Sequence, residues 1–310
     1  MSTFAPKPAD WIPFRDMAEL ERVRNIKRAD IEKHPNPDFK IKVVPDDQIE
    51  WIWVEDMFYR IWKSAQEGKK IVFITPNPAP CYARVASLIN RFRINCSHVY
   101  TFNMDEWADQ DGNIAPETYP QSLMRAYKRF FYSQIDPELR MPLENVFGPT
   151  NENINDYSKM IADMGGADVC YSGPGWSGHI AFIDPDAPEI DAPLEEWKTR
   201  TARVVTLHPL SIAQQSLHGS FGMSGDVANV PTKGATIGPA DVIGAKHRIE
   251  FHGITTAGTF VTWQRMASRL VLHGPVTPKV PSSILQTLRT DVYVSETLAA
   301  DIEPKWDRQY

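Results

Sequence analysis

The chain has 310 residues, of which 42% are hydrophobic and 23% charged, and its formal net charge is −6. These values are ordinary for a globular protein and leave room for one large α/β domain or two small ones. The acidic balance excludes a broad nucleic-acid-binding surface, although a local basic patch for an anionic ligand remains compatible with it.

The cysteines and the apolar stretches indicate the compartment. Cys81, Cys96 and Cys170 show neither CxxC spacing nor a metal-finger pattern. We therefore expect buried or free thiols rather than a disulfide framework. The sequence shows no apolar signal core, and no stretch approaches the ~20 apolar residues that span a bilayer. We expect a cytoplasmic protein with neither a membrane nor a nucleic-acid partner.

Residues 1–40 are rich in charge and proline, and we expect them to form an N-terminal extension with one short helix, roughly Met17 to Ile31. This extension would pack on the surface or on a partner subunit. From residue 41 onward, short apolar runs alternate with segments of helical periodicity. Strands are predicted at 41–44, 70–74, 99–104, 167–171, 203–207, 235–237, 248–252 and 291–294. Helices are predicted at 49–65, 81–92, 119–133, 154–164 and 259–271.

Strands that alternate with helices indicate βαβ units. The predicted fold is therefore α/β: a three-layer, mostly parallel, Rossmann-like sheet with helices on both faces. We find no internal repeat and no linker, so residues 41–310 are expected to form one domain. Within the helix at 49–65, the bulky residues Trp51, Trp53, Phe58 and Trp62 recur at helical spacing and are expected in the core.

The segment from Gly173 to Pro185 carries the clearest chemical signal. It has three glycines and a histidine, His179, directly after an apolar strand. Glycine allows a ligand to approach the backbone closely, and open α/β sheets bind ligands at the carboxyl ends of their strands. A histidine there can move protons near neutral pH. The same residues are also compatible with a structural turn that holds a hydrogen-bonded histidine.

Two acids, Asp105 and Glu106, follow the strand at 99–104. If the two strands are parallel neighbours, these acids share a crevice with the glycine turn, and one carboxylate could act as a general base. A helix cap or a solvated loop acid is the alternative. The sequence has no dinucleotide, P-loop, nucleophile-elbow or zinc-protease motif. We therefore predict no cofactor and no protein-bound metal.

Three blocks in this region resemble the glucosamine-6-phosphate deaminase (isomerase) family. They are Thr101-Phe102-Asn103-Met104-Asp105-Glu106-Trp107, Pro116-Glu117-Thr118-Tyr119, and Gly178-His179-Ile180-Ala181-Phe182 with Pro185. Their order and spacing match the family over roughly residues 40 to 300. The related 6-phosphogluconolactonases have different residues in the equivalent blocks. The resemblance implies that Asp105 moves a proton between C2 and C1 of the opened sugar and that His179 opens the ring. Asp184 stands where the family has a glutamate that supports this histidine.

The departures from the family concern the negative charge and the phosphate. Ser177 replaces an aspartate, and Trp176 replaces an asparagine. The family's glycine-rich phosphate loop reads Thr75-Pro76-Asn77-Pro78-Ala79-Pro80 here, and prolines lack the N–H groups that cradle a phosphate. Ser216 and Ala257 align with a phosphate-binding arginine and lysine. We therefore expect that a 6-phosphate is not bound in the family's manner, although Arg84, Arg203 or Lys233 could supply charge instead.

These observations predict a sugar isomerase or deaminase of this type with an altered, non-phosphorylated or differently substituted sugar. The predicted catalytic residues are Asp105, His179 and Asp184. The predicted substrate contacts are Thr75, Pro76, Asn77, Glu106, Gly175, Trp176, Ser177 and Gly178. A lactonase-type hydrolase and a non-catalytic sugar-binding regulatory protein remain alternatives. The family resemblance also implies a homo-oligomer.

Overall fold

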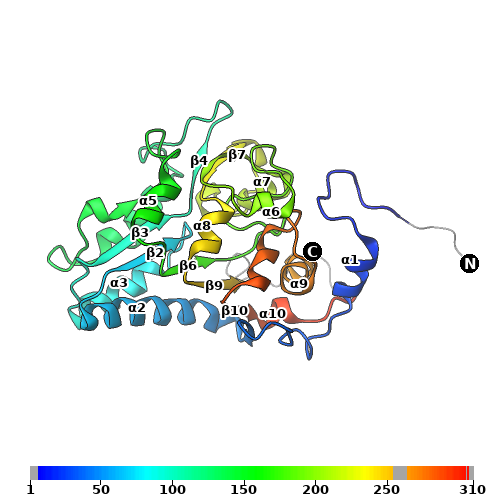
Figure 1. Ribbon diagram of the computed structural model, residues 1–310, viewed down its shortest axis with the longest axis horizontal. Helices are drawn as coiled ribbons and strands as arrows, with labels where there is room; N and C mark the ends of the chain where they lie inside the picture. Colours follow the sequence, from blue (N-terminus) through cyan, green and yellow to red (C-terminus); the bar gives the residue numbers. More distant parts are fainter. Residues whose placement is uncertain (1–5, 254–263, 305, 307–310) are drawn as a thin grey trace, which may run out of the picture.

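The computed structural model describes residues 6–253, 264–304 and 306, which contain a seven-stranded sheet with helices packed around it (Figure 1). The spatial order of its strands is β1 (Phe39–Val44), β10 (Thr290–Ser295), β9 (His247–His252), β6 (Val169–Ser172), β2 (Ile71–Thr75), β3 (Val99–Asn103) and β5 (Val146–Phe147). All neighbouring pairs in this sheet are parallel. The predicted fold class is confirmed.

The α-helices of the described residues are α1 (Met17–Arg24), α2 (Ile49–Glu67), α3 (Tyr82–Phe92), α4 (Leu123–Phe130), α5 (Tyr157–Asp163), α6 (Leu194–Trp197), α7 (Pro209–Gln215), α8 (Pro239–Gly244), α9 (Arg265–His273) and α10 (Glu296–Ala299). The predicted helices appear in the predicted order, although the helix of the extension ends at Arg24 instead of Ile31, and four short helices (α6, α7, α8 and α10) were not predicted. Residues 259–263 of the helix predicted at 259–271 lie outside the described residues. None of the helices in the described part of the chain combines the length and apolarity that a membrane crossing requires.

Buried side chains of the described residues form two clusters, one on each face of the sheet. Because successive strand residues point to opposite faces, Phe73 of β2 packs with α2, α3 and α4, whereas its neighbours Val72 and Ile74 pack with α5, α8 and α9. All five residues of β2 are buried, as expected for a central strand of a sheet covered on both sides. This arrangement gives the three layers.

A second, smaller sheet corrects part of the sequence interpretation. The strands predicted at 203–207 and 235–237 do not join the large sheet. Within the described residues, they are β7 (Arg203–Thr206) and β8 (Lys233–Thr236), which pair antiparallel with each other, and β8 also pairs with β4 (Asp105–Ala108). Asp105 and Glu106 therefore lie within a strand rather than in a loop. Their side chains point to opposite sides because strands have a period of two.

The aromatic residues of α2 were expected in the core, and for two of them this expectation is wrong. Trp53 is buried and stacks on Phe251, with 5.2 Å between ring centroids. In contrast, Trp51 is 50% exposed and Trp62 is 39% exposed. Helical periodicity identifies which residues share a face, but a helix with aromatic residues on more than one face cannot bury all of them against one sheet.

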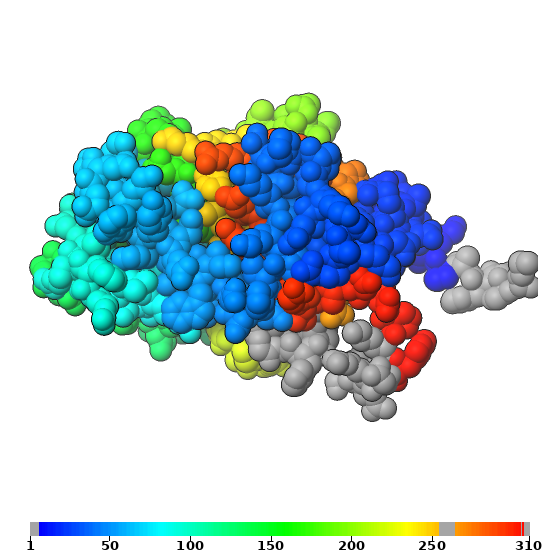
Figure 2. Space-filling view, turned by 90° about the horizontal axis from the view of Figure 1, so that it is seen from below, coloured from blue at the N-terminus to red at the C-terminus, as the bar shows by residue number. Residues whose placement is uncertain are grey.

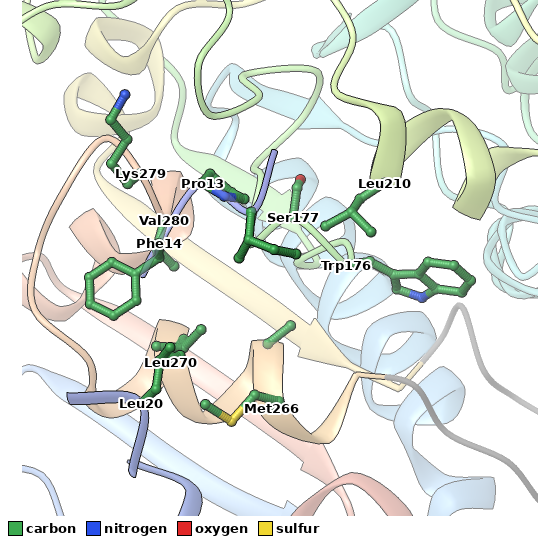
Figure 3. A pocket seen from close by; sticks show the side chains of 13 residues that line it. Pro13, Phe14, Leu20, Trp176, Ser177, Leu210, Met266, Leu270, Lys279 and Val280 are labelled. Carbon is green, nitrogen blue, oxygen red and sulfur yellow. The ribbon is translucent and has the colours of Figure 1, made fainter. Parts of the chain in front are cut away.

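The extension packs on its own chain in the described residues. Asp16 caps α1, because its carboxylate accepts hydrogen bonds from the backbone N–H groups of Ala18 and Glu19. Arg22 of α1 donates to the carbonyl of His273 at the end of α9. A mainly apolar cavity of about 210 Å³ separates Phe14 and other residues of the extension from the glycine turn (Figure 3).

The topology places the candidate site at one edge of the large sheet. After β2 the chain forms β3 and β5 on one side, and then returns to form β6, β9 and β10 on the other. The chain therefore changes direction between β2 and β6. Parallel sheets open a crevice at the carboxyl ends of the two strands that flank such a switch point. The segment 75–80 follows β2 and the glycine turn follows β6, so these two segments border the crevice.

Candidate active site

The glycine turn has little room for side chains. Gly178 has a φ of +76°, which disfavours other residues, and a Cβ there would approach Val280 Cγ1 to 2.8 Å. A Cβ on Gly175 would lie 2.3 Å from His179 Nε2. A hydrogen bond from the Ser282 hydroxyl to the backbone carbonyl of His179, at 2.7 Å, also holds the turn. Both glycines are therefore needed to seat the imidazole.

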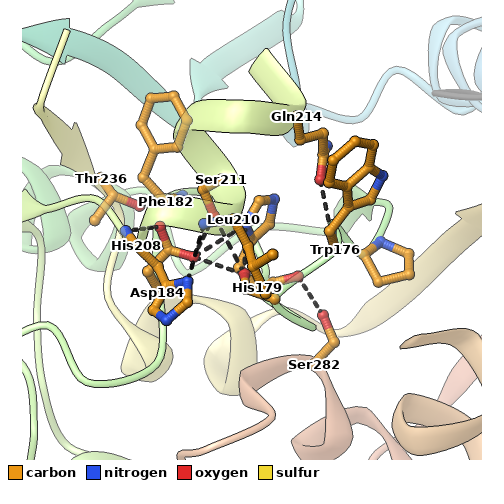
Figure 4. Close-up of polar contacts among 12 residues, drawn as sticks. Trp176, His179, Phe182, Asp184, His208, Leu210, Ser211, Gln214, Thr236 and Ser282 are labelled. Carbon is orange, nitrogen blue, oxygen red and sulfur yellow. Dashed lines mark hydrogen bonds and ion pairs between the residues drawn. The ribbon is translucent and has the colours of Figure 1, made fainter. Parts of the chain in front are cut away.

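The imidazole of His179 takes part in a buried cluster of four polar side chains (Figure 4). Its Nδ1 lies 3.1 Å from Asp184 Oδ1, 2.8 Å from Ser211 Oγ and 3.0 Å from Ser177 Oγ. Both serine hydroxyls donate to Asp184 Oδ1, at 2.7 Å from Ser177 and 2.6 Å from Ser211. Because each hydroxyl then turns a lone pair toward the ring, Nδ1 carries the proton. The neutral ring therefore keeps Nε2 as its basic nitrogen.

The electrostatics of Asp184 favour its charged form. Burial would raise the pKa of this carboxyl, but attraction to His179 and hydrogen bonds from His179, Ser211 and the backbone N–H of His208 leave its pKa below the ordinary value. The His208 N–H donates to Asp184 Oδ2 at 2.9 Å. A charged Asp184 stabilises the imidazolium that forms when His179 accepts a proton. The structure thus brings together the predicted His179, Asp184 and Ser177.

Asp105 lies on β4, next to the end of β3. It is 6% exposed, and its Oδ1 is buried with no hydrogen-bond partner among the described residues. Burial, and then repulsion by the neighbouring Glu106, raise the pKa of Asp105 well above the ordinary value. Its strand is tied to the glycine turn through β8, since Thr236 pairs with Asp105 and its hydroxyl accepts a hydrogen bond from Phe182 N–H. An unpartnered carboxyl of raised pKa is suited to take up a proton.

Glu106, predicted to touch substrate, has a different environment. Its carboxylate accepts hydrogen bonds from the Ser122 hydroxyl and from the backbone N–H groups of Trp107, Leu123 and Met124. These donors include the first N–H groups of α4, which have no partner within the helix. Glu106 therefore holds the start of α4, and its carboxylate oxygens are already occupied by these donors.

The segment after β2 is polar but uncharged. The hydroxyl of Thr75 is buried beside the Phe102 carbonyl and Asn103 Oδ1. The carbonyl of Pro76 accepts a hydrogen bond from the Tyr82 hydroxyl. Both side-chain amide atoms of Asn77 are buried and have no hydrogen-bond partner in the described structure. Of these three predicted contacts, Asn77 thus has the unused hydrogen-bonding capacity.

The cations considered as replacement phosphate ligands are engaged elsewhere. Arg84 pairs with Glu50 at 2.5 Å and lies over the ring of Trp51. Arg203 donates to the backbone carbonyl of Glu189. Burial would raise the pKa of the carboxyl of the same Glu189, but the positive charge of Lys233 is among the interactions that lower this pKa. Ala257 lies outside the described residues.

Cys81 directly precedes α3, and its thiol is buried, as expected. Burial, reinforced by the charge of Glu50, raises the pKa of this thiol to about 12. Cys81 is therefore a packing residue rather than an activated thiol. Cys96 and Cys170 are likewise buried and free.

Three further residues at the site were not predicted. Ser211 lies in the first turn of α7 and reaches His179 and Asp184. Gln214, one turn later, accepts a hydrogen bond from Trp176 N–H at 2.7 Å. His218 is buried, and this burial together with repulsion by His179 lowers its pKa to about 4, which keeps its ring neutral. Hydroxyl and amide residues in a helix that follows a strand carry no local signal of function, so only the fold could reveal them.

Comparisons with known proteins agree with the motif resemblance. No family model matches the sequence. The glucosamine-6-phosphate deaminase of Lachnoclostridium phytofermentans is 26% identical over 215 residues, which cover 67% of this chain and 78% of that protein. That of Thermoanaerobacter pseudethanolicus is 26% identical over 262 residues, covering 79% and 91%. That of Rhodopirellula baltica is 28% identical over 234 residues, covering 74% and 81%.

Solved structures share the fold. A monomeric glucosamine-6-phosphate deaminase matches 84% of this chain and 98% of its own, with a TM-score of 0.64 and 18% identity. The 6-phosphogluconolactonase from Leishmania guyanensis matches 85% and 98%, with a TM-score of 0.59 and 13% identity. Deaminase and lactonase structures thus share this architecture, and the sequence relatives confirm the resemblance to the deaminases.

Proposed function

We propose that this chain, a distant member of the glucosamine-6-phosphate deaminase family, is an aldose–ketose isomerase or deaminase that acts on an amino sugar or sugar lacking a conventionally bound phosphate. The observation that carries the proposal is the buried cluster of His179 with Asp184, at the carboxyl end of a strand beside the switch point. Two further features support it: Asp105 Oδ1, which has no hydrogen-bond partner among the described residues, and the uncharged segment after β2. The buried free cysteines favour a cytoplasmic setting.

In the proposed reaction, His179 Nε2 takes the proton of the C1 hydroxyl and returns it to the ring oxygen as the C1–O5 bond breaks. Asp184 stabilises the transient imidazolium. Asp105 then removes the proton on C2, giving an enediolate or enolaminate, and delivers it to C1. O1 takes up the proton that the C2 hydroxyl or ammonium group gives up as the C2–O or C2–N double bond forms. If C2 carries an amine, the resulting imine is hydrolysed by water, and ammonia leaves. If C2 carries a hydroxyl, the product is the ketose.

The proposed distal contacts of the sugar are neutral. Asn77 has unused amide donors and acceptors, and His218 has a buried Nε2 without a partner in the described structure. Such groups suit hydroxyls, whereas a phosphate dianion without cations or N–H donors would lose about 1.5–3 kcal/mol for each missing charge-assisted hydrogen bond. We therefore propose that an uncharged terminal group of the sugar lies there.

The test compares glucosamine, glucosamine 6-phosphate, glucose and glucose 6-phosphate as substrates in deuterated buffer. Ammonia release and loss of the C2 proton signal by NMR are the readouts, with Asp105→Asn as the control for background. We expect turnover of a free sugar with exchange at C2. A strong preference for glucosamine 6-phosphate would overturn the altered phosphate site, and hydrolysis of a sugar lactone without exchange at C2 would favour the lactonase alternative.

A further inference from the structure

The face of α2 that points away from the sheet is unusually aromatic. Trp51, Tyr59 and Trp62 are 50%, 53% and 39% exposed, and Phe92 of α3, which packs on Phe58, is 57% exposed. We call Trp51, Tyr59, Trp62 and Phe92 the α2 aromatic face. The helix runs along the lower edge of the molecule in Figure 1, and Figure 2 looks onto the molecule from that side. Nothing in the proposed reaction uses these side chains.

Large exposed aromatic residues that lie close together mark interaction surfaces rather than ordinary solvent-facing helices. On α2 the exposed positions 51, 55, 59, 62 and 66 are three or four residues apart, so they form one continuous stripe. A stripe of this spacing fits against another helix. The charged residues beside the aromatic side chains indicate which helix that is.

The charged residues of the stripe complement those of a second copy of the same helix. Glu55 lies four residues before Tyr59 and Lys63 lies four residues after it, and all three are exposed. Glu55 has no ion pair among the described residues, and Lys63 has only a long contact of 3.9 Å with Glu67. If two copies of α2 pack antiparallel with Tyr59 on the two-fold axis, Glu55 of each copy lies opposite Lys63 of the other. A parallel arrangement would place like charges together.

We propose that the α2 aromatic face joins two copies of this chain in a two-fold symmetric dimer. Such an interface is self-complementary, as closed dimers require. At 150–250 Å² for each fully buried aromatic side chain, the half-exposed members of the α2 aromatic face in two copies supply on the order of 800 Å². Stable interfaces bury about 1,200–2,000 Å², and the stems of Glu55, Lys63 and Gln66 with the neighbouring surface of α3 add to the aromatic share.

The test measures the mass of the full chain by sedimentation equilibrium across the micromolar range. The wild type is expected to be a dimer. Trp62→Glu is expected to give a monomer that stays folded, with an unchanged circular dichroism spectrum, because the side chain lies at the surface of α2. Val227→Glu changes a residue that is 51% exposed in a segment that contacts α7, which lies across the molecule from α2 in Figure 1, and it should leave the dimer intact.

A charge swap tests the antiparallel register. Glu55→Lys alone and Lys63→Glu alone each place like charges opposite one another and should weaken the dimer at least ~10-fold, or about 1.4 kcal/mol. The double variant should restore the dimer, whereas Glu195→Lys, at an exposed position of α6 away from α2 in Figure 1, should have no effect. A monomeric wild type, a dimer that ignores Trp62→Glu, or a double variant that stays dissociated would each overturn the proposal. None of these outcomes depends on which sugar is turned over.

Discussion

Asp105 and Asp184 are both buried carboxyls, but their surroundings shift their pKa values in opposite directions. Asp184 receives hydrogen bonds and a neighbouring imidazole, which outweigh burial and lower its pKa. Asp105 has a buried oxygen without a partner and a second carboxyl beside it, and its pKa is raised. Pairs of acids with opposite shifts are typical of sites where one group stabilises charge and the other moves a proton.

Asp105→Asn should abolish turnover and stabilise the fold at neutral pH. A carboxyl whose pKa is raised on folding stabilises the protein only while protonated, so the wild type loses stability as pH rises from about 4 toward the folded pKa. The asparagine variant does not suffer this loss, which amounts to about 1.4 kcal/mol for each pKa unit of the shift. Urea unfolding of both proteins between pH 4 and pH 8 measures the difference, which should grow with pH.

A variant that loses activity and is also less stable than wild type at every pH would show that Asp105 is a structural residue. Full activity in Asp105→Asn would refute its role as the base.

Ser211→Ala should move the pH profile of the reaction. Its hydroxyl donates to Asp184 and contacts His179 Nδ1, so its loss raises the pKa of Asp184 and loosens the imidazole. The acidic limb of kcat should shift to higher pH, and kcat should fall roughly tenfold or more, because a hydrogen bond to a charged group contributes about 1.5–3 kcal/mol. Steady-state kinetics across pH give both values.

The control for Ser211→Ala is Ser216→Ala. Ser216 is also buried, just after α7, but its hydroxyl donates to the carbonyl of Ala213. This variant should leave the pH profile in place, and Ser211→Thr, which keeps a hydroxyl, should restore much of the activity. An unchanged profile in Ser211→Ala would remove Ser211 from the positioning of His179.

At the scale of elements, β4 separates two adjacent acids by function. A strand sends successive side chains to opposite sides, so Asp105 and Glu106 cannot serve the same site. Glu106 meets the beginning of α4, where two backbone N–H groups and the Ser122 hydroxyl donate to its carboxylate, and the N–H of Trp107 in β4 donates to it as well. β4 thus places one carboxyl, Glu106, at the beginning of α4 and the other, the proposed base Asp105, on its opposite side.

Glu106→Ala should destabilise the fold by several kcal/mol, because each buried donor left without a partner costs about 1–3 kcal/mol. Its residual activity at low temperature should be close to that of the wild type, since Asp105 stays in place. Denaturant unfolding checks the first effect and assays of the folded variant check the second. Glu117→Ala, an exposed acid paired with Lys128, should change stability little. Specific loss of activity in folded Glu106→Ala would return Glu106 to the site.

At the scale of the whole molecule, the N-terminal extension lies next to the glycine turn and its cluster. The carbonyl of Trp11 accepts a hydrogen bond from His208, whose backbone N–H holds Asp184. Phe14 and Leu20 face the glycine turn across the cavity seen in Figure 3. The extension, although far away in the sequence, therefore contacts the residues that hold Asp184 and the glycine turn.

Deleting residues 1–14 should lower both stability and activity. The deletion removes partly buried apolar side chains and a hydrogen bond, and we expect a loss of about 2 kcal/mol and a fall in kcat. Deleting residues 1–8 keeps Trp11 and Phe14 and is the matched control. Thermal unfolding and activity assays of both proteins decide the matter, and equal behaviour of the two deletions would show that Trp11 to Phe14 do not support the site.

The sequence by itself determined the α/β class, the order of the longer strands and helices, and the segment that holds His179 and Asp184. These features are local: a period of two or 3.6, a glycine turn after a strand, and a carboxylate five positions after an imidazole. The tertiary structure decided which of two adjacent acids is free, that Ser211 joins the cluster, that β7 and β8 leave the main sheet, and that Trp51 and Trp62 face outward. Each of these depends on which distant segment packs beside a residue, and periodicity along one element carries no information about its neighbours.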